Sequence, residues 1–313
     1  MNITESLSII QELLDRQLNY WKQQLAGANP LLELPTDRPR LAVQTYQSKN
    51  QSFILPSSLS DGLVKLCHQD EVTLYTRLLA AFVTLLYRYS KQEDIIIGSA
   101  IGEKNQVALR TNLSGNPSFQ ELLTRVNSVV SDAHKHQDLP LEKLLAELYP
   151  ERSLSYHPLF QVLFRLENAT EESTAHTAIF DLTLSMSEKD GVISGTWNYS
   201  TDLFDDATIT RMMGHYQTLL AGAIANFKQP ISQLPLLTVE ETQQLLAQGN
   251  NSFSEYPEDK KLHPQGDGVF GHGEEITNAQ CPKRRGGCPS PPTRGWSFPP
   301  LSINVFISYL RHR

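Results

Sequence analysis

Several side chains that can move protons or bind charge gather between residues 136 and 157. They are His136, Asp138, Glu142, Arg152 and His157. Histidine is the usual base near neutral pH, and carboxylates and a guanidinium can act as acids, bases or charge stabilisers. All of them fall in or beside predicted loops, where binding and catalytic groups concentrate. Residues 136–157 are therefore the first region to consider for chemistry.

The same residues also have structural interpretations. His136 ends a predicted helix, where a histidine suits the negative end of the helix dipole, and Asp138 can tie the following turn. Ser155 has no GxSxG context, so the sequence does not predict a nucleophile there. The residues alone favour the structural interpretation, and we predict no catalytic residue in the chain.

The elements that position these groups are predicted to be helix, loop, helix, loop and strand. The first helix spans residues 117–136, and Ser118 with Glu121 fits a capping box at its start. Pro140 suits the start of a short second helix, which Tyr149 ends because a proline follows it. The apolar run over residues 159–167 then predicts a buried strand.

The rest of the chain alternates between helical and extended patterns. Further helices are predicted at residues 5–25, 59–68, 73–90, 205–227 and 238–249, and further strands at 51–55, 94–100, 179–187 and 192–199. Helix 73–90 is apolar nearly all round and should be buried against a sheet, with strand 94–98 parallel to another strand through that helix. Residues 189–191 predict a hairpin between the last two strands. The fold class is therefore α/β, with a mixed sheet flanked by helices.

Two runs in the 136–164 region resemble signature segments of the condensation domains of non-ribosomal peptide synthetases. The first run matches the family pattern HQDxPFE at His136, Gln137, Asp138, Pro140 and Glu142. The second run matches RDxSxNPLFQV at Arg152, Ser155, Pro158, Leu159 and Phe160. Ser153 and His157 stand where the family has Asp and Asn. The resemblance extends from about Leu18 to about Tyr256.

The resemblance implies the C-terminal lobe of a condensation domain, half of a chloramphenicol-acetyltransferase-like pair. Family members form a peptide bond between thioesters on carrier proteins, and their catalytic centre is an HHxxxDG motif in the N-terminal lobe. The sequence contains no His-His pair, so the resemblance implies a fragment that is inactive alone. Arg152 matches an arginine associated with holding the Asp of that motif. The alternative is a non-catalytic docking module or a degenerate remnant.

The resemblance also implies partners and a missing segment. We expect peptidyl carrier proteins, other synthetase modules and a separate N-terminal lobe as partners, and the carrier's phosphopantetheine arm as the substrate carrier rather than a bound cofactor. Loops 102–107 and 136–142 are expected near the route of that arm. A GxFVNT-like strand of the family is absent between Gln106 and Val107. Either residues 107–111 take its place or the sheet is defective.

Composition narrows the functional classes. The 313 residues are 40% hydrophobic and 19% charged, with a net charge of −7, which is ordinary for a soluble globular protein. An acidic chain argues against a nucleic-acid partner, and no apolar run approaches the roughly 20 residues of a membrane helix. The N-terminus has no signal-peptide pattern, and the three cysteines have no zinc spacing. We expect a cytoplasmic location and no metal.

Three segments are predicted along the chain. Residues 1–237 form the lobe, and residues 238–260 form a linker that in the family leads to an adenylation domain. Residues 261–313 are dense in proline and glycine and lack periodicity, so they cannot bury enough apolar surface to offset their ordering entropy. We predict that this tail is disordered, after a disrupted reading frame.

Overall fold

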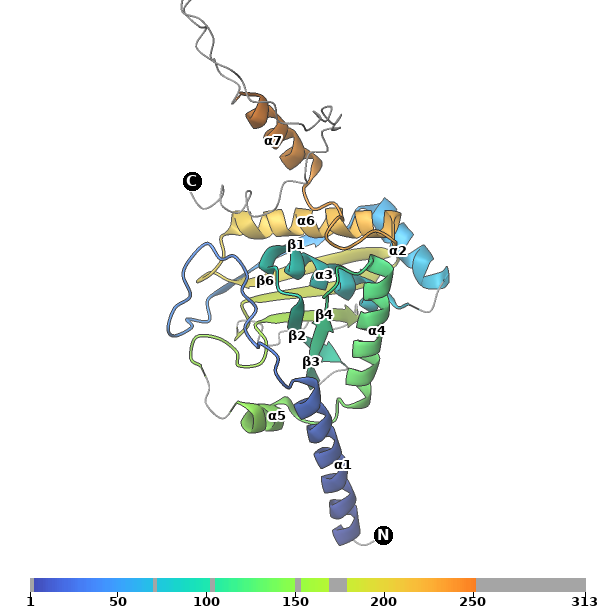
Figure 1. Cartoon of the computed structure of the whole chain (residues 1–313), viewed down its shortest axis with the longest axis vertical. Coiled ribbons are helices and arrows are strands. Elements are labelled where there is room, and N and C mark those ends of the chain that lie inside the picture. The colour runs from blue at the N-terminus through green and yellow to red at the C-terminus, as the bar shows by residue number, and fades with distance from the viewer. Residues whose placement is uncertain (1–2, 70–71, 102–104, 150–152, 169–178, 252–313) are drawn as a thin grey trace, which may run out of the picture. The chain divides into compact units, whose positions relative to one another are not determined.

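The computed structural model describes residues 3–69, 72–101, 105–149, 153–168 and 179–251. The helices are α1 (Ile3–Gln24), α2 (Ser57–Gln69), α3 (Leu74–Ser90), α4 (Phe119–Lys135), α5 (Leu141–Leu148), α6 (Asp206–Ala225) and α7 (Val239–Asn251). The strands are β1 (Ser48–Ile54), β2 (Asp94–Ile101), β3 (Asn105–Asn112), β4 (Val162–Asn168), β5 (Leu182–Lys189) and β6 (Val192–Ser200). The alternation confirms the predicted α/β class (Figure 1).

The six described strands form one mixed sheet in the order β1-β6-β5-β4-β2-β3. Strands β4 and β5 are parallel, as are β2 and β4, and the other neighbouring pairs are antiparallel. The predicted parallel pairing of β2 through the preceding helix is wrong. The strand before that helix is β1, which lies at the far edge, and the parallel neighbour of β2 is β4, which comes later in the chain.

Strand β3 shows that residues 107–111 pair in the sheet. It pairs with β2 along its whole length, from Asp94 opposite Asn112 to Ile101 opposite Asn105. Residues 107–111 therefore pair in the sheet, so β2 is not left as an unpaired edge. Arg110 on this strand donates to both carboxylate oxygens of Asp94 and to the carbonyl oxygen of Gln24 at 2.9 Å, which satisfies the end of α1.

One face of the sheet is covered by α3 and α6, which Figure 1 shows lying across the strands. Phe82 of α3 is fully buried, and its ring centroid lies 5.7 Å from those of Phe164 on β4 and Trp197 on β6. The Tyr216 hydroxyl of α6 donates to the Leu78 carbonyl oxygen at 3.1 Å. Full burial of each large apolar side chain contributes about 1.5–3 kcal/mol. The prediction that helix 73–90 is buried is confirmed.

Two strand predictions need correction. The run over residues 159–167 becomes a strand only at Val162, because Gln161 turns back and donates its side-chain amide to the His157 carbonyl oxygen at 2.9 Å. The segment from Asp181 to Met186 alternates polar and apolar residues, which predicts a half-exposed strand. It is buried on both faces, with Thr183 fully inaccessible to solvent.

The ends of several elements follow local chemistry. The hairpin between β5 and β6 turns at Asp190 and Gly191, with φ values of 52° and 81°, which suits the turn that two-residue hairpins prefer. The capping box at Ser118 is present, with Glu121 as its partner. The N-cap residue of α6 is an aspartate whose side chain does not cap the helix. Asp205 occupies the cap position, but it makes no capping hydrogen bond and instead pairs with Arg38.

The chain divides into a compact unit, Met1–Leu245, and a second unit, Leu246–Arg313. The predicted disordered tail, residues 261–313, lies outside the described residues, as does Arg152. Among the described residues, no helix is both long enough and apolar enough to cross a membrane.

Candidate functional site

The first motif run forms the junction between α4 and α5. His136 is the C-terminal cap of α4, and Pro140 is the residue before α5 begins. The His136 Nδ1 atom lies 2.8 Å from the Asp132 carbonyl oxygen. Because a carbonyl oxygen can only accept, Nδ1 carries the proton, and in the neutral ring Nε2 holds the lone pair. His136 therefore caps the helix as predicted.

Helix α1 holds His136 from the other side. The imidazole stacks on the Tyr20 ring at a centroid distance of 3.6 Å and an interplanar angle of 4°. The His136 carbonyl oxygen accepts a hydrogen bond from Trp21 Nε1 at 2.9 Å. Trp21 is 2% exposed, which agrees with the core role expected for an aromatic residue on a helix.

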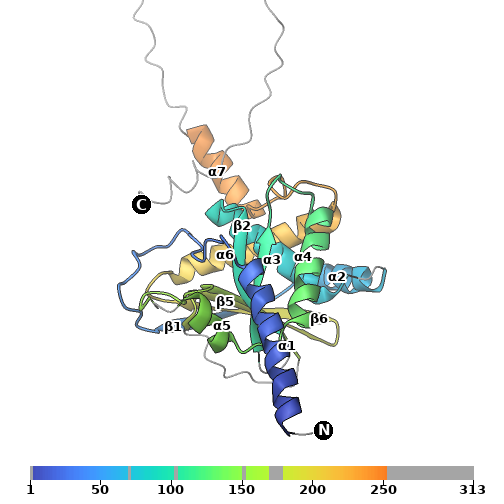
Figure 2. The same cartoon turned by 60° about the horizontal axis from the view of Figure 1, so that its bottom comes forward.

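The remaining residues of the first run continue this contact with α1. The Asp138 carboxylate accepts from the Gln17 side-chain amide at 2.9 Å, so it joins the junction to α1. Gln137 follows the cap, and Glu142 lies in the first turn of α5. At the other end of α5, Glu147 pairs with Lys22 at 2.8 Å. Helix α5 therefore lies beside the C-terminal half of α1 (Figure 2).

The second motif run meets a different part of the N-terminal segment. The Ser155 hydroxyl donates to the Leu41 carbonyl oxygen, and the Gln44 backbone N–H donates to the Leu154 carbonyl oxygen at 3.0 Å. Ser155 thus fixes a loop, and nothing in this contact activates it as a nucleophile. Pro158 follows in the turn that leads to β4.

Leu159 and Phe160 are completely buried ahead of β4. The Phe160 ring lies directly over Gly98 of β2, where a Cβ atom would come within 2.1 Å of a ring carbon. Position 98 therefore requires glycine because the ring occupies the space of any side chain. This packing explains the apolar pair in the motif without any role in chemistry.

Gln161 is a positioning residue that the sequence analysis passed over. Its Oε1 atom accepts the Leu32 backbone N–H at 2.9 Å, and its own carbonyl oxygen accepts the Asp181 N–H at 2.8 Å. With the bond to His157 described above, this buried amide joins three segments. The glutamine of the PLFQV pattern was the available signal, since a polar residue in an apolar run is buried only with partners.

Arg40 and Asp181 form the second contact that the sequence did not reveal. Arg40 donates to both carboxylate oxygens of Asp181, one of them at 2.8 Å, and to the Ser155 carbonyl oxygen at 3.3 Å. Its guanidinium also lies 5.7 Å from the Tyr156 ring centroid. Burial raises the pKa of Asp181, and the hydrogen bonds and charge of Arg40 oppose that rise. The carboxylate is only 5% exposed, so the pair depends on its close geometry.

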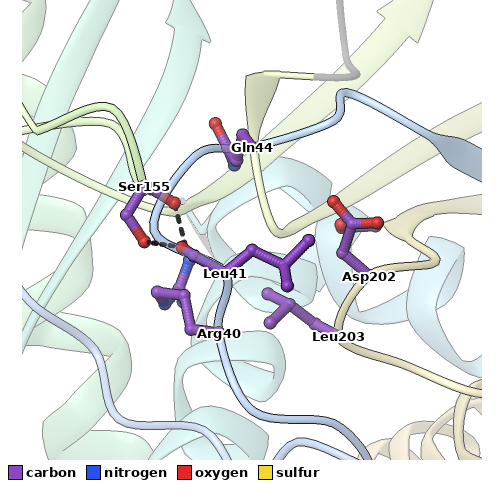
Figure 3. Close-up of a pocket in the computed structure, with 7 residues that line it drawn as sticks. Arg40, Leu41, Gln44, Ser155, Asp202 and Leu203 are labelled. Atoms are coloured by element: carbon purple, nitrogen blue, oxygen red, sulfur yellow. Dashed lines mark hydrogen bonds between the residues drawn. The ribbon is translucent and has the colours of Figure 1, made fainter.

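A small hollow lies beside this pair. Figure 3 shows its lining, in which Ser155 faces Leu41 and Arg40 while Asp202 stands across from them. The space amounts to about 180 Å³, including part that is open to solvent. Sites for small organic ligands usually measure about 300–1,000 Å³, so the hollow is too small to hold such a ligand.

The two motif runs are joined by one segment, residues 17–44, which we call the N-terminal strap. Its helical part, at Gln17 and Trp21, bonds to the first run, and its extended part, at Leu32, Arg40 and Gln44, bonds to the second. The hydrogen bonds of the described motif residues thus have a structural role, which is to hold the N-terminal strap on the lobe. Within the described ranges, no cluster of three or more His, Cys, Asp or Glu side chains is placed to hold a metal ion.

A partial form of the catalytic motif occurs late in the sequence. Leu262 is followed by His263, and Asp267 and Gly268 complete an HxxxDG spacing, with leucine in place of the first histidine. The prediction of no catalytic residue rested on the absent His-His pair and did not include this match. It lies outside the described residues and beyond the family match given below.

Comparison with known proteins identifies the family. The sequence model of the condensation domain matches residues 5–246. One of the linear gramicidin synthase proteins of Brevibacillus parabrevis is 42% identical over 280 residues, which cover 80% of this chain and 4% of that protein. A surfactin synthase protein of Bacillus subtilis (strain 168) is 36% identical over 269 residues, which cover 78% of this chain and 8% of that protein.

Solved structures share the fold. Holo-AB3403, a four-domain nonribosomal peptide synthetase bound to AMP and glycine, has a TM-score of 0.67 and 23% identity, over 73% of this chain and 20% of that one. The X-domain from teicoplanin biosynthesis, in complex with OxyB, has a TM-score of 0.67 and 25% identity, over 72% of this chain and 56% of that one.

The aligned part of this chain spans only 4–8% of the length of the first five curated relatives. The family match covers most of the chain, both motif runs lie inside it, and the mixed sheet agrees with the solved structures. The chain belongs to the condensation-domain family of nonribosomal peptide synthetases.

Proposed function

We propose that the chain is the C-terminal lobe of a condensation domain that joins carrier-bound aminoacyl or peptidyl thioesters. The amine of the acceptor attacks the carbonyl carbon of the donor thioester. A C–N bond forms, the C–S bond breaks, and the donor's phosphopantetheine thiol leaves while the amine loses a proton. The observation that carries this proposal is the family match over residues 5–246, in which both described motif runs are folded and packed.

In this proposal the chain supplies a wall, and the HHxxxDG motif comes from a preceding segment or a separate polypeptide. His136, Asp138 and Phe160 keep the wall in shape through their contacts with the N-terminal strap and β2. No catalytic step is assigned to these residues, because the contacts described for them are packing and helix-capping contacts. The partners are then peptidyl carrier proteins and neighbouring synthetase modules.

The sheet face opposite α3 suits contact with a carrier arm. Ser52 and Thr196 are direct neighbours on β1 and β6, where Ser52 is exposed and Thr196 is half-buried, and their hydroxyls lie 2.9 Å apart. A phosphopantetheine arm carries amides and a hydroxyl, which such a polar surface can bind. This complementarity supports a role as one wall of the substrate passage.

A second candidate is a docking module that performs no catalysis. It is favoured by the likeness to the X-domain, a protein whose solved structure is a complex with OxyB. In this role the chain would keep the carrier-facing surface and need no HHxxxDG motif. The two candidates differ in whether product forms when that motif is supplied.

The test uses donor and acceptor aminoacyl carriers and detects dipeptidyl thioester by mass spectrometry. We expect no product from the chain alone and product once a separate HHxxxDG-bearing lobe is added. Retained carrier binding without product in both cases would favour the docking module. Product from the chain alone would contradict the proposal, and its loss in the His263→Ala or His136→Ala variant would identify the base.

A further inference from the structure

The segment that leaves the lobe, residues 229–241, is bound closely to it, and we call this segment the exit strap. Its first part pairs with the start of α4. The Phe119 N–H donates to the Gln229 carbonyl oxygen at 3.1 Å, and the Ile231 N–H donates to the Pro117 carbonyl oxygen at 3.0 Å. These two hydrogen bonds fix the first part of the exit strap against the start of α4.

The middle of the exit strap rests on α3 and α6. Arg88 of α3 donates to the carbonyl oxygens of Ile231 at 3.3 Å and Leu234 at 2.7 Å. Pro235 sits on Gly222 of α6, where a Cβ atom would come within 2.4 Å of the proline ring. These contacts bring the chain to the start of α7.

Three side chains then close the strap onto the lobe. The Tyr89 hydroxyl of α3 lies 2.6 Å from His215 Nδ1 of α6, and His215 Nε2 lies 2.9 Å from the Glu241 carboxylate of α7. The same carboxylate oxygen accepts the Thr238 backbone N–H at 2.9 Å. His215 is 2% exposed, so these bonds are protected from water and bridge three helices.

The donors and acceptors fit only one protonation state without loss. An ionised carboxylate can only accept, so His215 Nε2 must carry a proton. The Tyr89 hydroxyl hydrogen has an acceptor in this cluster only if Nδ1 carries a lone pair, whereas a protonated Nδ1 would leave that hydrogen without an acceptor there. Burial raises the pKa of Tyr89, which keeps its hydroxyl as a donor. The geometry therefore assigns His215 as neutral.

The surrounding charges act in the same direction on balance. Burial is the largest cause that lowers the pKa of His215 below its usual 6.5, and Arg211 of α6 and Arg88 of α3 lower it further. Glu241 of α7 raises it, through its charge and its hydrogen bond. Because the closed state disfavours the proton, its stability is complete above pH 6.5 and is lost as the pH falls below that value.

We propose that Tyr89, His215 and Glu241 form a proton-sensitive latch, which holds the start of α7 on the lobe while His215 is neutral and releases it when His215 is protonated. The latch sets the path by which the chain leaves the condensation lobe toward whatever segment follows. It operates independently of the peptide-bond chemistry proposed above.

Amide hydrogen exchange of the full chain tests the latch, in a peptide covering residues 236–245 at pH 7.5 and pH 5.5. Rates are corrected for the intrinsic effect of pH, and a peptide from β5 serves as the internal reference. If the closed state binds no proton and the open state has a pKa of about 6.5, linkage predicts that protection falls about tenfold between these pH values. Equal protection of the 236–245 peptide at both pH values would overturn the proposal.

Three variants separate the latch from general destabilisation. Tyr89→Phe removes one hydroxyl and should lower protection of the 236–245 peptide already at pH 7.5. His215→Gln offers an amide donor and acceptor that do not titrate, so its protection should not respond to pH. The exposed His134 provides the control, and His134→Ala should behave as wild type. Wild-type protection in Tyr89→Phe, or an unchanged pH response in His215→Gln, would refute the latch.

Discussion

The N-terminal strap and the exit strap are both clamped to the same lobe, but by different chemistry. The N-terminal strap is held by hydrogen bonds to motif residues and by the ion pair of Arg40 and Asp181. The exit strap is held by hydrogen bonds from Arg88 to its carbonyl oxygens, by the packing of Pro235 on Gly222 and by the bond from buried His215 to Glu241. The motif residues, His136 among them, thus bind the N-terminal strap. The more deeply buried histidine, His215, binds the exit strap.

The largest effect is expected where the N-terminal strap depends on a buried charge. Asp181→Ala leaves Arg40 largely buried without its carboxylate, and such a change costs about 3–5 kcal/mol of unfolding free energy. Urea unfolding measures the loss. Asp132→Ala is the control, because its carboxylate pairs with the exposed Lys135, and it should change stability far less. Equal losses in the two variants would show that the ion pair does not clamp the strap.

The two histidines provide the next comparison. His215→Ala leaves the Tyr89 hydroxyl without its partner and leaves the Glu241 carboxylate with the Thr238 N–H alone. A buried polar group that loses its partner costs about 1–3 kcal/mol. His136 is only half-buried and loses one capping bond and one stack, which we expect to cost about 1 kcal/mol. Chemical denaturation of both variants tests this order, and a larger loss for His136→Ala would reverse the comparison.

Gly98 beneath Phe160 and Gly222 beneath Pro235 provide a third comparison between the two regions. Gly98→Ala places a methyl group inside the buried Phe160 ring, and Gly222→Ala places one against Pro235. Overpacking of this kind costs about 1–3 kcal/mol, and the closer approach at Gly98 should make its cost the greater. Thermal unfolding compares the two, with Gly62→Ala as control because only one atom lies within 4 Å of its Cβ, at 3.9 Å. A smaller loss at position 98 than at 62 would contradict the packing account.

The parts of this structure that were predictable from sequence are those set by local pattern. The all-round apolarity of residues 73–90 gave α3, and the Asp190-Gly191 turn gave the hairpin. Order in the sheet was not predictable, because β2 pairs with β4 across a long stretch of intervening chain. The start of β4 was misplaced because a side-chain bond of Gln161 decides it.

The candidate site was also predictable only where a local sequence pattern exists. The motif positions were found in the sequence, but their partners were not, since Gln17 lies 121 residues from Asp138 and Arg40 lies 141 residues from Asp181. The His215–Glu241 contact lies in no motif, and both residues fall on separate helices. Contacts between segments far apart in sequence leave no local pattern, so only the folded chain reveals them.

The most direct test of the account is the rate of dipeptidyl thioester formation with the HHxxxDG-bearing lobe supplied, compared between wild type and His136→Phe. The phenyl ring keeps the stack on Tyr20 but cannot accept a proton, so a structural role predicts a change of less than about tenfold. Loss of a general base costs about 10²–10⁴-fold. A fall of that size, with amide protection of α1 unchanged, would contradict the claim that the motif residues hold the lobe together rather than react.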